Sequence, residues 1–276
     1  MGTLYLIATP IGNLEDITLR ALRLLGKVDL IAAEDTRHTG RLLAHYGVDT
    51  PQISYHEHNK LTRLDAVLKT LETGDVALVS DAGTPGLSDP GYELVRAAIS
   101  HGVPVVPIPG PSALTAALVA SGLPTDAFVY LGFLPRRATD RRRLLTEIAS
   151  ECRTLVAFES PRRLAAALED VEAVLGDRQV TVARELTKLY EEIWRGPASE
   201  ARARFAGEVR GEITLVIAGA SPPPPWDDQR VQDTVSDLMS QGLSHRQAVK
   251  QVSQTSGRSR RNVYQLTVGT EKQSRK

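Results

Sequence analysis

The sequence predicts an α/β protein with two α/β lobes, a ligand cleft between them, and a small C-terminal unit of three helices that is helix-turn-helix-like. Short apolar runs rich in β-branched residues alternate with amphipathic segments over residues 3–220. Several of these runs end in long loops of glycine and proline, a composition typical of ligand sites. A proline run then separates three short helical segments from the rest.

The first lobe is expected to hold a largely parallel sheet, because strands that alternate with helices pair in parallel through crossover connections. Each strand candidate is short and apolar, and each helix candidate has apolar residues three or four positions apart. The expected strands are 4–9, 28–34, 76–80, 103–107 and 128–131, and the expected helices are 17–25, 36–46, 60–73, 91–101 and 112–121.

The second lobe is expected to follow a charged linker at 136–143, where five arginines accompany a single acid. The alternation then resumes, with strands at 154–158, 180–184, 192–195 and 213–218 and a helix at 161–175. This pattern predicts an N-terminal lobe with the cofactor loops at 1–135 and a C-terminal lobe that completes the cleft at 136–220.

A third unit is expected after a proline run at 221–225, which predicts a stiff linker over 221–228. Within 229–276, helical spacing recurs at 229–240, 244–254 and 258–267. Three short helices with tight turns are typical of a helix-turn-helix, and a generic helical tail fits the same pattern. From Ser244 onward eight basic residues accompany one acid, so we expect this tail to bind RNA.

Composition limits the class of protein. The 276 residues are 42% hydrophobic and carry 33 basic and 33 acidic side chains, so attraction to nucleic acid must come from local patches. The single cysteine, Cys152, excludes an intramolecular disulfide. No stretch approaches the roughly 18 apolar residues of a membrane helix, and we expect a cytoplasmic protein.

Three loops carry the ligand-site pattern. Thr9–Leu14 follows the first expected strand, Ser80–Gly91 the third and Pro107–Ser112 the fourth. Ligands bind outside the carboxyl ends of strands in an open parallel sheet, so the three loops are expected to line one pocket. The second loop has about twelve residues, roughly twice the usual length of a strand-to-helix connection.

The loops do not match the common nucleotide motifs. No G-x-G-x-x-G follows the first strand, and no P-loop ends in Lys-Ser/Thr, so NAD and ATP are disfavoured. Loops with backbone donors, backbone acceptors and few cationic side chains suit a ligand with amino, carboxylate, ribose and adenine groups. S-adenosyl-L-methionine is one of several such ligands.

Five blocks of sequence narrow the choice of ligand and of function. The chain resembles the bacterial 16S ribosomal RNA (cytidine-2′-O)-methyltransferase I family, an RNA-modifying branch of the tetrapyrrole methylase superfamily. The blocks that carry the resemblance are Leu6–Thr18, Ala33–Gly40, Ser80–Gly91, Pro109–Ser112 and Ala183–Lys188. The tetrapyrrole enzymes have a G-x-G-x-G-D type loop after the first strand, where this chain has Thr-Pro-Ile-Gly-Asn, and this difference matches the RNA branch.

The resemblance implies two lobes of tetrapyrrole methylase type, a homodimer, and S-adenosylmethionine bent in the cleft. It also implies 2′-O-methylation of a cytidine ribose in the decoding centre (P site) of 16S rRNA in the small ribosomal subunit. The cofactor-binding residues it implies are Pro10, Gly12, Asp81, Ala82, Gly83, Ser88, Asp89, Pro90, Pro109, Gly110, Pro111, Ser112, Leu131 and Gly132.

The candidate catalytic residues lie in two places, directly after the second expected strand and near residue 185. Asp35 or Glu34 is expected to take the proton of the hydroxyl, and Arg37 to bind a phosphate or stabilise the alkoxide. An alternative is that Asp35 caps a helix and pairs with Arg37. Glu185 and Lys188 are expected to close over the cleft, or else to form an exposed salt bridge.

Charge assigns the RNA contacts, and no metal is expected. The residues assigned to RNA are Arg136, Arg137, Arg141, Arg142, Arg143, Arg258, Arg260 and Arg261. His56 and His58 share a face if extended, but further ligands are not evident. Two other functions stay open: a small-molecule tetrapyrrole (precorrin-like) methyltransferase, and a ligand-sensing nucleic-acid-binding protein.

Overall fold

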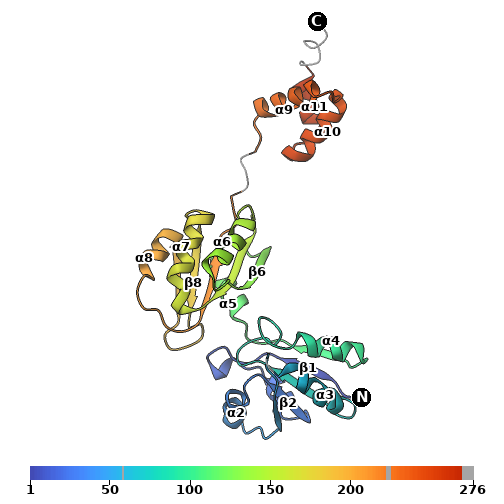
Figure 1. The fold of residues 1–276 in the computed structure, drawn as a ribbon, viewed down its shortest axis with the longest axis vertical. Coiled ribbons are helices and arrows are strands. Elements are labelled where there is room, and N and C mark those ends of the chain that lie inside the picture. The colour runs from blue at the N-terminus through green and yellow to red at the C-terminus, as the bar shows by residue number, and fades with distance from the viewer. Residues whose placement is uncertain (58, 222–224, 269–276) are drawn as a thin grey trace. The chain divides into compact units, whose positions relative to one another are not determined.

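The computed structural model describes residues 1–57, 59–221 and 225–268, and its chain divides into two compact units, Met1–Ala220 and Ser221–Lys276. Within these described residues, the first unit contains two five-stranded sheets with helices packed on them, and the second contains three helices (Figure 1). The α/β fold class expected from the sequence is confirmed.

The first sheet is parallel throughout, as predicted. Its strand order is β3-β2-β4-β1-β5, and every neighbouring pair runs in the same direction. Its strands are β1 (Leu4–Ile7), β2 (Leu30–Ala33), β3 (Gln52–Ser54), β4 (Val76–Val79) and β5 (Val105–Ile108). The sequence pattern missed β3 because this strand is three residues long and only one of them is apolar.

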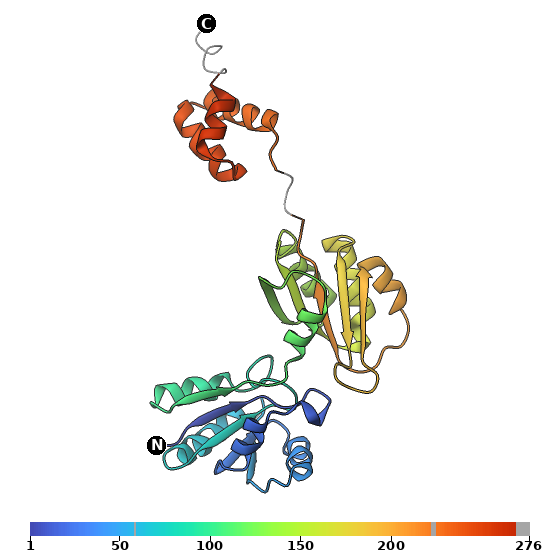
Figure 2. The ribbon, with the colours of Figure 1, turned by 180° about the vertical axis from the view of Figure 1, so that it is seen from behind.

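Helices cover both faces of the first sheet (Figures 1 and 2). Because side chains alternate along a strand, Ile31 packs with α1 (Leu19–Leu25) and α2 (Thr36–His45), whereas Ala32 packs with the opposite layer. That layer holds α3 (Lys60–Leu71) and α4 (Tyr92–Ser100). A 3-10 helix, η1 (Leu14–Asp16), follows the loop after β1.

The second sheet is mixed, a pairing for which the sequence pattern gave no expectation. Its order is β6-β7-β10-β8-β9, and only β6 and β7 are parallel. Its strands are β6 (Phe128–Phe133), β7 (Thr154–Glu159), β8 (Gln179–Arg184), β9 (Glu192–Pro197) and β10 (Ile213–Ile217). Strand β6 was assigned by sequence to the first lobe, but its hydrogen bonds to β7 make it part of the second sheet.

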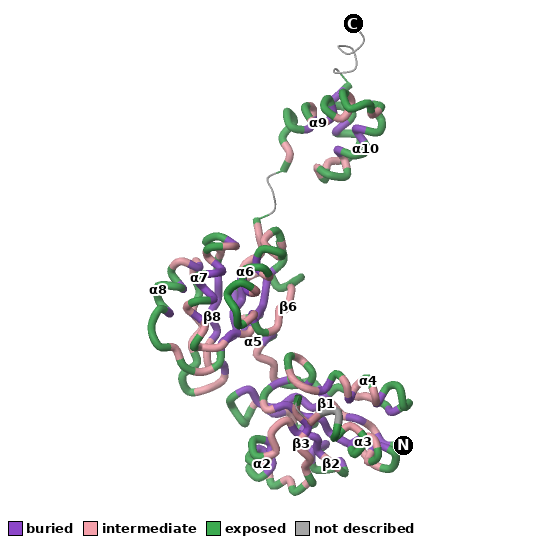
Figure 3. The backbone as a smooth tube through the Cα atoms, in the orientation of Figure 1, coloured by how far each residue is buried: buried purple, intermediate pink, exposed green. Residues whose placement is uncertain are grey.

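Three helices cover one face of the second sheet: α6 (Ala138–Glu147), α7 (Leu164–Leu175) and α8 (Ala198–Arg204). A 3-10 helix, η2 (Pro161–Arg163), comes directly before α7. Helix α5 (Ala113–Ala120) packs on the other face, with Ile11 of the first lobe. Figure 3 shows buried positions along β8, while much of α8 is exposed.

The expected charged linker at 136–143 is instead the start of α6. Arg141 is 3% exposed, and its Nε donates to Asp170 Oδ2 on α7 over 2.7 Å. Arg141 also donates to the carbonyls of Pro135 and Ala166. Arg141 was expected to contact RNA, and that expectation is wrong because the guanidinium is buried and its hydrogen bonds go to the protein. Arg142 is exposed, and its Nε also donates to Asp170.

The second unit contains α9 (Asp228–Ser240), α10 (His245–Ser256) and α11 (Arg260–Thr267), packed around a small core of valines. Ser244 is the N-cap of α10 and forms a capping box with Gln247. Arg258 was expected to contact RNA, but its guanidinium donates to Asp228 and to the Trp226 carbonyl, so it is a structural residue. Pro222–Pro224 and the basic residues at 272, 275 and 276 lie outside the described residues.

Among residues 1–57, 59–221 and 225–268, no helix has the length and apolarity needed to cross a bilayer.

Breaking the buried Arg141–Asp170 pair is expected to destabilise the protein strongly. Asp170→Ala leaves a buried guanidinium without its carboxylate, which costs about 3–5 kcal/mol of the free energy of unfolding. The matched control is Asp140→Ala, whose exposed pair with Arg143 spans 3.7 Å and contributes about 0–1 kcal/mol. Urea denaturation of both variants measures the difference. Equal losses would mean that the buried pair has no special role.

Candidate functional site

The site lies where two neighbouring strands of the first sheet send the chain to opposite faces. Strand β1 leads to α1 on one face, and β4, its neighbour, leads to α4 on the other. Such a position leaves a crevice at the carboxyl ends of the two strands. The backbones beyond these ends are joined, since Thr9 N donates to Gly83 O over 2.9 Å and Gly83 N donates to Thr9 O over 3.0 Å.

The three predicted loops come together around this bridge. Gly83 has φ +83°, and a Cβ there would lie 3.4 Å from the Ile11 side chain and 3.8 Å from Pro111 O. A Cβ on Gly110 would lie 3.0 Å from the Ala8 Cβ. Glycine at these positions lets the loops that follow β1, β4 and β5 approach one another.

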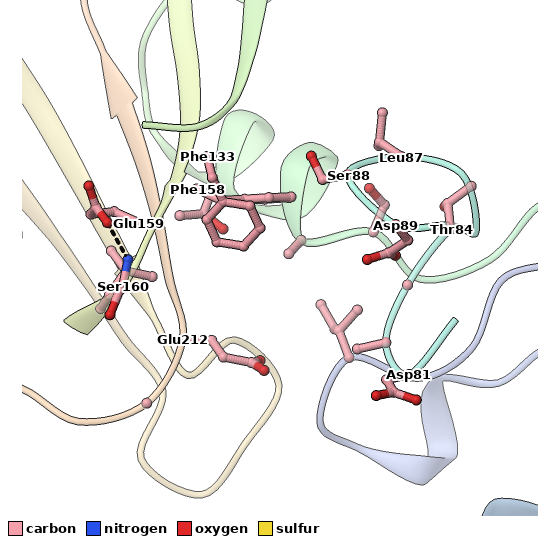
Figure 4. Close-up of a pocket in the computed structure, with 18 of the residues that line it drawn as sticks. Asp81, Thr84, Leu87, Ser88, Asp89, Phe133, Phe158, Glu159, Ser160 and Glu212 are labelled. Carbon is pink, nitrogen blue, oxygen red and sulfur yellow. Dashed lines mark hydrogen bonds between the residues drawn. The ribbon is translucent and has the colours of Figure 1, made fainter. Parts of the chain in front are cut away.

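A cavity of about 360 Å³ opens beside the loops, with walls from both lobes (Figure 4). This volume is within the range of roughly 300–1,000 Å³ typical of small-molecule sites. Ser88 and Asp89 lie on one side, and Phe133 and Phe158 project from the other. The expected site residues that line it are Glu34, Asp81, Ala82, Gly83, Ser88, Asp89 and Ser112.

The other expected site residues lie outside the lining. Pro10 lines a smaller pocket of about 30 Å³ with Thr39 and Asp81. Gly12 packs against the side chain of Lys188. The remaining ones belong to the loops and strand ends around the cavity without lining it: Pro90, Pro109, Gly110, Pro111, Leu131 and Gly132, together with Asp35, Arg37, Glu185 and Lys188.

Sequence reasoning missed the whole second-lobe wall, which comprises Phe133, Phe158, Glu159, Ser160, Pro161 and Gly211–Thr214. The Ser160–Pro161 step after β7 follows the same strand-to-helix rule as the first-lobe loops, so it was detectable. Gly211–Thr214 was not, because β10 is antiparallel to β7 and its beginning therefore lies beside the end of β7, with Ile213 opposite Glu159.

The first-lobe wall is acidic and held by backbone hydrogen bonds. Asp81 N donates to Glu34 Oε2 over 3.2 Å, and Asp35 N donates to Asp81 Oδ1 over 3.0 Å. These bonds join the ends of β2 and β4 and fix the carboxylates of Glu34 and Asp81 at the cavity.

Burial and mutual repulsion alter the acidity of this wall. Burial raises the pKa of Glu34, and the neighbouring Asp81 and Asp35 charges act in the same direction. Burial, with repulsion from Glu34, raises the pKa of Asp89 to about 7. Both carboxyl groups are therefore better proton acceptors than ordinary surface acids.

Asp35 has the opposite environment. It is the N-cap of α2, where it accepts from Arg37 N over 2.8 Å, and it also accepts two hydrogen bonds from the Arg37 guanidinium. These hydrogen bonds hold the pKa of Asp35 well below its ordinary value. Arg37 is 87% exposed in its side chain. Asp35 therefore caps α2 and forms an ion pair with Arg37, which is the alternative that the sequence offered for these two residues.

A strained loop of the second lobe packs against the first-lobe loop. Glu185 and Thr187 have φ of +51° and +67°, which is costly for residues with a Cβ. Lys188 Nζ donates to Glu185 Oε1 over 2.7 Å and to Glu212 Oε2 over 3.2 Å. A Cβ on Gly12 would lie 2.4 Å from Lys188 Cγ, so glycine is what lets the lysine stem cross this loop.

Charge partners fix the protonation of this lysine. Burial lowers the pKa of Lys188, but the hydrogen bond to Glu185 and the charge of Glu212 outweigh it, and the pKa is raised. The hydrogen bond from Lys188 in turn lowers the pKa of Glu185. The pair stays charged at neutral pH, so it can bind or position an anion but is poorly suited to accept a proton.

A hydrogen bond joins the two lobes across the cavity mouth. Ser88 Oγ and Tyr130 Oη are 2.6 Å apart, and Gly132, with φ +65°, leaves room beside Ser88. Burial raises the pKa of Tyr130.

No cluster of three or more metal-ligating side chains occurs within the described residues. His58, considered with His56 as a metal ligand, lies outside them.

Residues 3–202 match the model of the family described as Tetrapyrrole (Corrin/Porphyrin) Methylases. The chain is 51% identical to Ribosomal RNA small subunit methyltransferase I of Synechocystis sp., over 98% of this chain and 99% of that protein. The chain belongs to the tetrapyrrole methylase family, in the ribosomal RNA small subunit methyltransferase I branch.

Two further proteins are similar to this tetrapyrrole methylase, one in sequence and one in fold. The Thermotoga maritima protein of the same printed name is 50% identical, and the match covers 79% of this chain but 99% of that one. The Thermus thermophilus uroporphyrin-III C-methyltransferase, solved in complex with S-adenyl homocysteine, has a TM-score of 0.56 at 22% identity over 79% of this chain and 97% of that one. This similarity shows that the fold is shared.

The half-buried carboxyl of Asp89 is expected to make stability depend on pH. Its folded pKa lies above the unfolded value of about 3.9, so ionisation opposes folding as pH rises from about 4 to about 7. Asp89→Asn should therefore stabilise the protein at pH 8 and have little effect at pH 4. Urea denaturation at the two pH values tests this, with Asp65→Asn on the exposed side of α3 as control. An equal effect at both pH values would contradict the expectation.

Proposed function

We propose that this protein is an S-adenosylmethionine-dependent methyltransferase that 2′-O-methylates the ribose of a cytidine in the decoding centre of 16S rRNA. The observation that carries the proposal is the 51% identity, along nearly the whole of both chains, with a protein named Ribosomal RNA small subunit methyltransferase I. A substrate in the small ribosomal subunit and a cytoplasmic location follow from the same proposal. The choice of ribose and cytidine rests on the resemblance of the five sequence blocks.

The cavity suits the cofactor in charge and in polar partners. S-adenosylmethionine carries a sulfonium and an ammonium group, and the cavity wall presents Glu34, Asp81 and Asp89. Opposite charges at short range attract, more strongly where burial lowers the effective dielectric constant. Gly83 and Ser112 also line the cavity, and their backbones and the hydroxyl offer polar partners. When bound, the cofactor supplies a methyl carbon on a cationic sulfur.

Glu34 is the proposed general base. It lines the cavity, and burial raises its pKa toward the range in which a carboxylate accepts a proton from a hydroxyl group. The proton of the ribose 2′-hydroxyl would pass to a Glu34 carboxylate oxygen. Asp35 is less suitable because its oxygens already accept hydrogen bonds from Arg37 and its pKa is lowered.

Lys188 and Arg37 are proposed to act through charge. Lys188 lies next to Glu212 of the cavity wall and stays protonated, so it can stabilise a negatively charged oxygen or a phosphate. Arg37, at the start of α2, presents an exposed guanidinium that can bind phosphate with its free N–H groups.

The tail is proposed to be an accessory RNA-binding module. The Thermotoga maritima relative is matched over 99% of its length by 79% of this chain, which supports a catalytic body complete without the tail. Arg260 and Arg261 of α11 are exposed, and with Arg136, Arg137, Arg142 and Arg143 they remain the charge-assigned RNA contacts. We also propose a homodimer, which sedimentation equilibrium tests.

Methyl transfer is tested with small ribosomal subunits from cells that lack this activity. The enzyme is supplied with S-adenosylmethionine carrying a labelled methyl group, and the rRNA is digested and analysed by nucleoside mass spectrometry. Label on a cytidine ribose is the expected result. Cofactor binding without transfer to rRNA would favour the small-molecule tetrapyrrole methyltransferase instead.

Glu34→Gln is expected to lower kcat by about 10²- to 10⁴-fold, the usual contribution of a general base. Asp35→Asn is the control, since amide oxygen can still cap α2, and it should lower kcat much less. Steady-state kinetics with separate KM values for cofactor and RNA measure both. A full rate in Glu34→Gln with a large loss in Asp35→Asn would reverse the assignment.

Truncation after Ala220 is expected to raise KM for RNA and leave kcat near that of the full chain. The reason is that Met1–Ala220 is a compact unit which contains the whole cavity lining. The comparison uses saturating RNA for kcat and limiting RNA for kcat/KM. Unchanged RNA affinity would remove the tail from the RNA-binding surface.

A further inference from the structure

A second hollow adjoins the cavity on the second-lobe side. Its volume is about 650 Å³, and Pro161 and Gly211 line both this hollow and the cavity, so the two are neighbours at these residues. The small residues Ala165, Ala206 and Gly207 form part of its wall, and these leave the backbone accessible.

The ionised side chains of this hollow carry a small net positive charge. Arg162, Arg210 and Glu208 line it. Arg162 is exposed and forms no ion pair with any residue that the structure describes, while Arg210 is 83% exposed and pairs with Glu208 over 3.1 Å. The cavity wall on the first lobe is acidic instead, through Glu34, Asp81 and Asp89. A polyanion is therefore repelled from the first-lobe side, and on the second-lobe side Arg162 offers it a positive charge without an ion-pair partner among the described residues.

An exposed aromatic ring of the second lobe lines the cavity. Phe133 lines the cavity and is 58% exposed, and one part of its ring meets Phe158 edge-on at a centroid distance of 5.5 Å. The register of β6 with β7 shifts between Tyr130 and Phe133, and Gly132 takes a positive φ within this irregularity. Such bulges re-aim side chains at the end of a strand. Figure 4 shows Phe133 pointing toward the loop that carries Ser88.

We propose that the Arg162–Arg210 hollow is the path of the substrate RNA strand, with Phe133 stacking on a base at the cavity mouth and Arg162 binding a phosphate. This inference rests on the proposed function and deepens it, because it assigns the polyanionic substrate to one side of the cavity. A positive groove with an aromatic platform is the usual arrangement for single-stranded nucleic acid. A flat ring stacks on any base, and Arg162 has a guanidinium free to form two parallel hydrogen bonds to phosphate.

The phosphate contact is tested by the salt dependence of binding to a short, fluorescein-labelled single-stranded RNA that contains cytidine. Fluorescence anisotropy is measured on the full chain, with and without S-adenosylhomocysteine. Each phosphate contact contributes about −0.7 to the slope of log K against log salt. Arg162→Ala should reduce the magnitude of the slope by about 0.7, whereas Arg63→Ala, an exposed arginine on α3, should leave it unchanged. An unchanged slope in Arg162→Ala, or equal changes in both variants, overturns the phosphate contact.

The stacking contact is tested by Phe133→Ala beside Phe133→Tyr, which keeps the ring. Stacking on an aromatic side chain corresponds to about tenfold in affinity, or about 1.4 kcal/mol. Phe133→Ala should weaken RNA binding by about that factor, and Phe133→Tyr should bind RNA as tightly as the unchanged protein. Cofactor affinity, measured by calorimetry, should be the same in both. Loss of cofactor affinity with intact RNA affinity would assign the ring to the cofactor and overturn the proposal.

These binding measurements are separate from methyl transfer. If labelled methyl never reaches rRNA but the Arg162 and Phe133 effects on RNA affinity appear, the proposed reaction fails and the RNA path stands. If methyl transfer occurs and neither substitution alters RNA affinity, the reaction stands and the path is wrong.

Discussion

The site depends on the two backbone hydrogen bonds between Thr9 and Gly83. They join the loops that leave β1 and β4, two neighbouring strands whose helices lie on opposite faces, at the point where the sheet would otherwise open. Thr9 Oγ1 adds a bond to the Ser80 carbonyl over 3.0 Å. With these loops fixed, the Asp81 carboxylate accepts a hydrogen bond from Asp35 N, and Asp81 N donates one to the Glu34 carboxylate. These two hydrogen bonds hold the acidic wall of the cavity together.

Much of the first lobe and half of the cavity were predictable from local sequence. The loop Ser80–Gly91 was predicted because it is longer and richer in glycine than an ordinary strand-to-helix connection. Three of its residues, Asp81, Ser88 and Asp89, do line the cavity. The other half depends on strand pairing, which a periodic pattern does not contain. Gly211 and Glu212 reach the site only because β10 runs antiparallel to β7.

Charge patterns in the sequence predicted poorly which arginines are exposed and which are buried. The run Arg141–Arg143 has no feature that separates one arginine from the next, yet Arg141 is buried against Asp170, 29 positions away, and Arg143 is exposed. The difference comes from the packing of α6 on α7, which puts one face of the helix against the other. An arginine assigned to RNA from charge alone therefore needs the partner helix before its role is known. Arg162, which that assignment left out, is exposed and forms no ion pair within the described chain.

The loop at Glu185–Lys188 has a consequence for how this chain can change. Gly12 and Gly211 sit beneath Lys188 and Glu185, with no room for a Cβ at either glycine unless these side chains move. The left-handed backbone at Glu185 and Thr187 is tolerated only while these contacts hold it. Substitutions at these positions therefore interact, and a change acceptable in one background is harmful in another. Sequence drift across the lobe boundary must proceed through linked pairs, so the two lobes are constrained to evolve as one body.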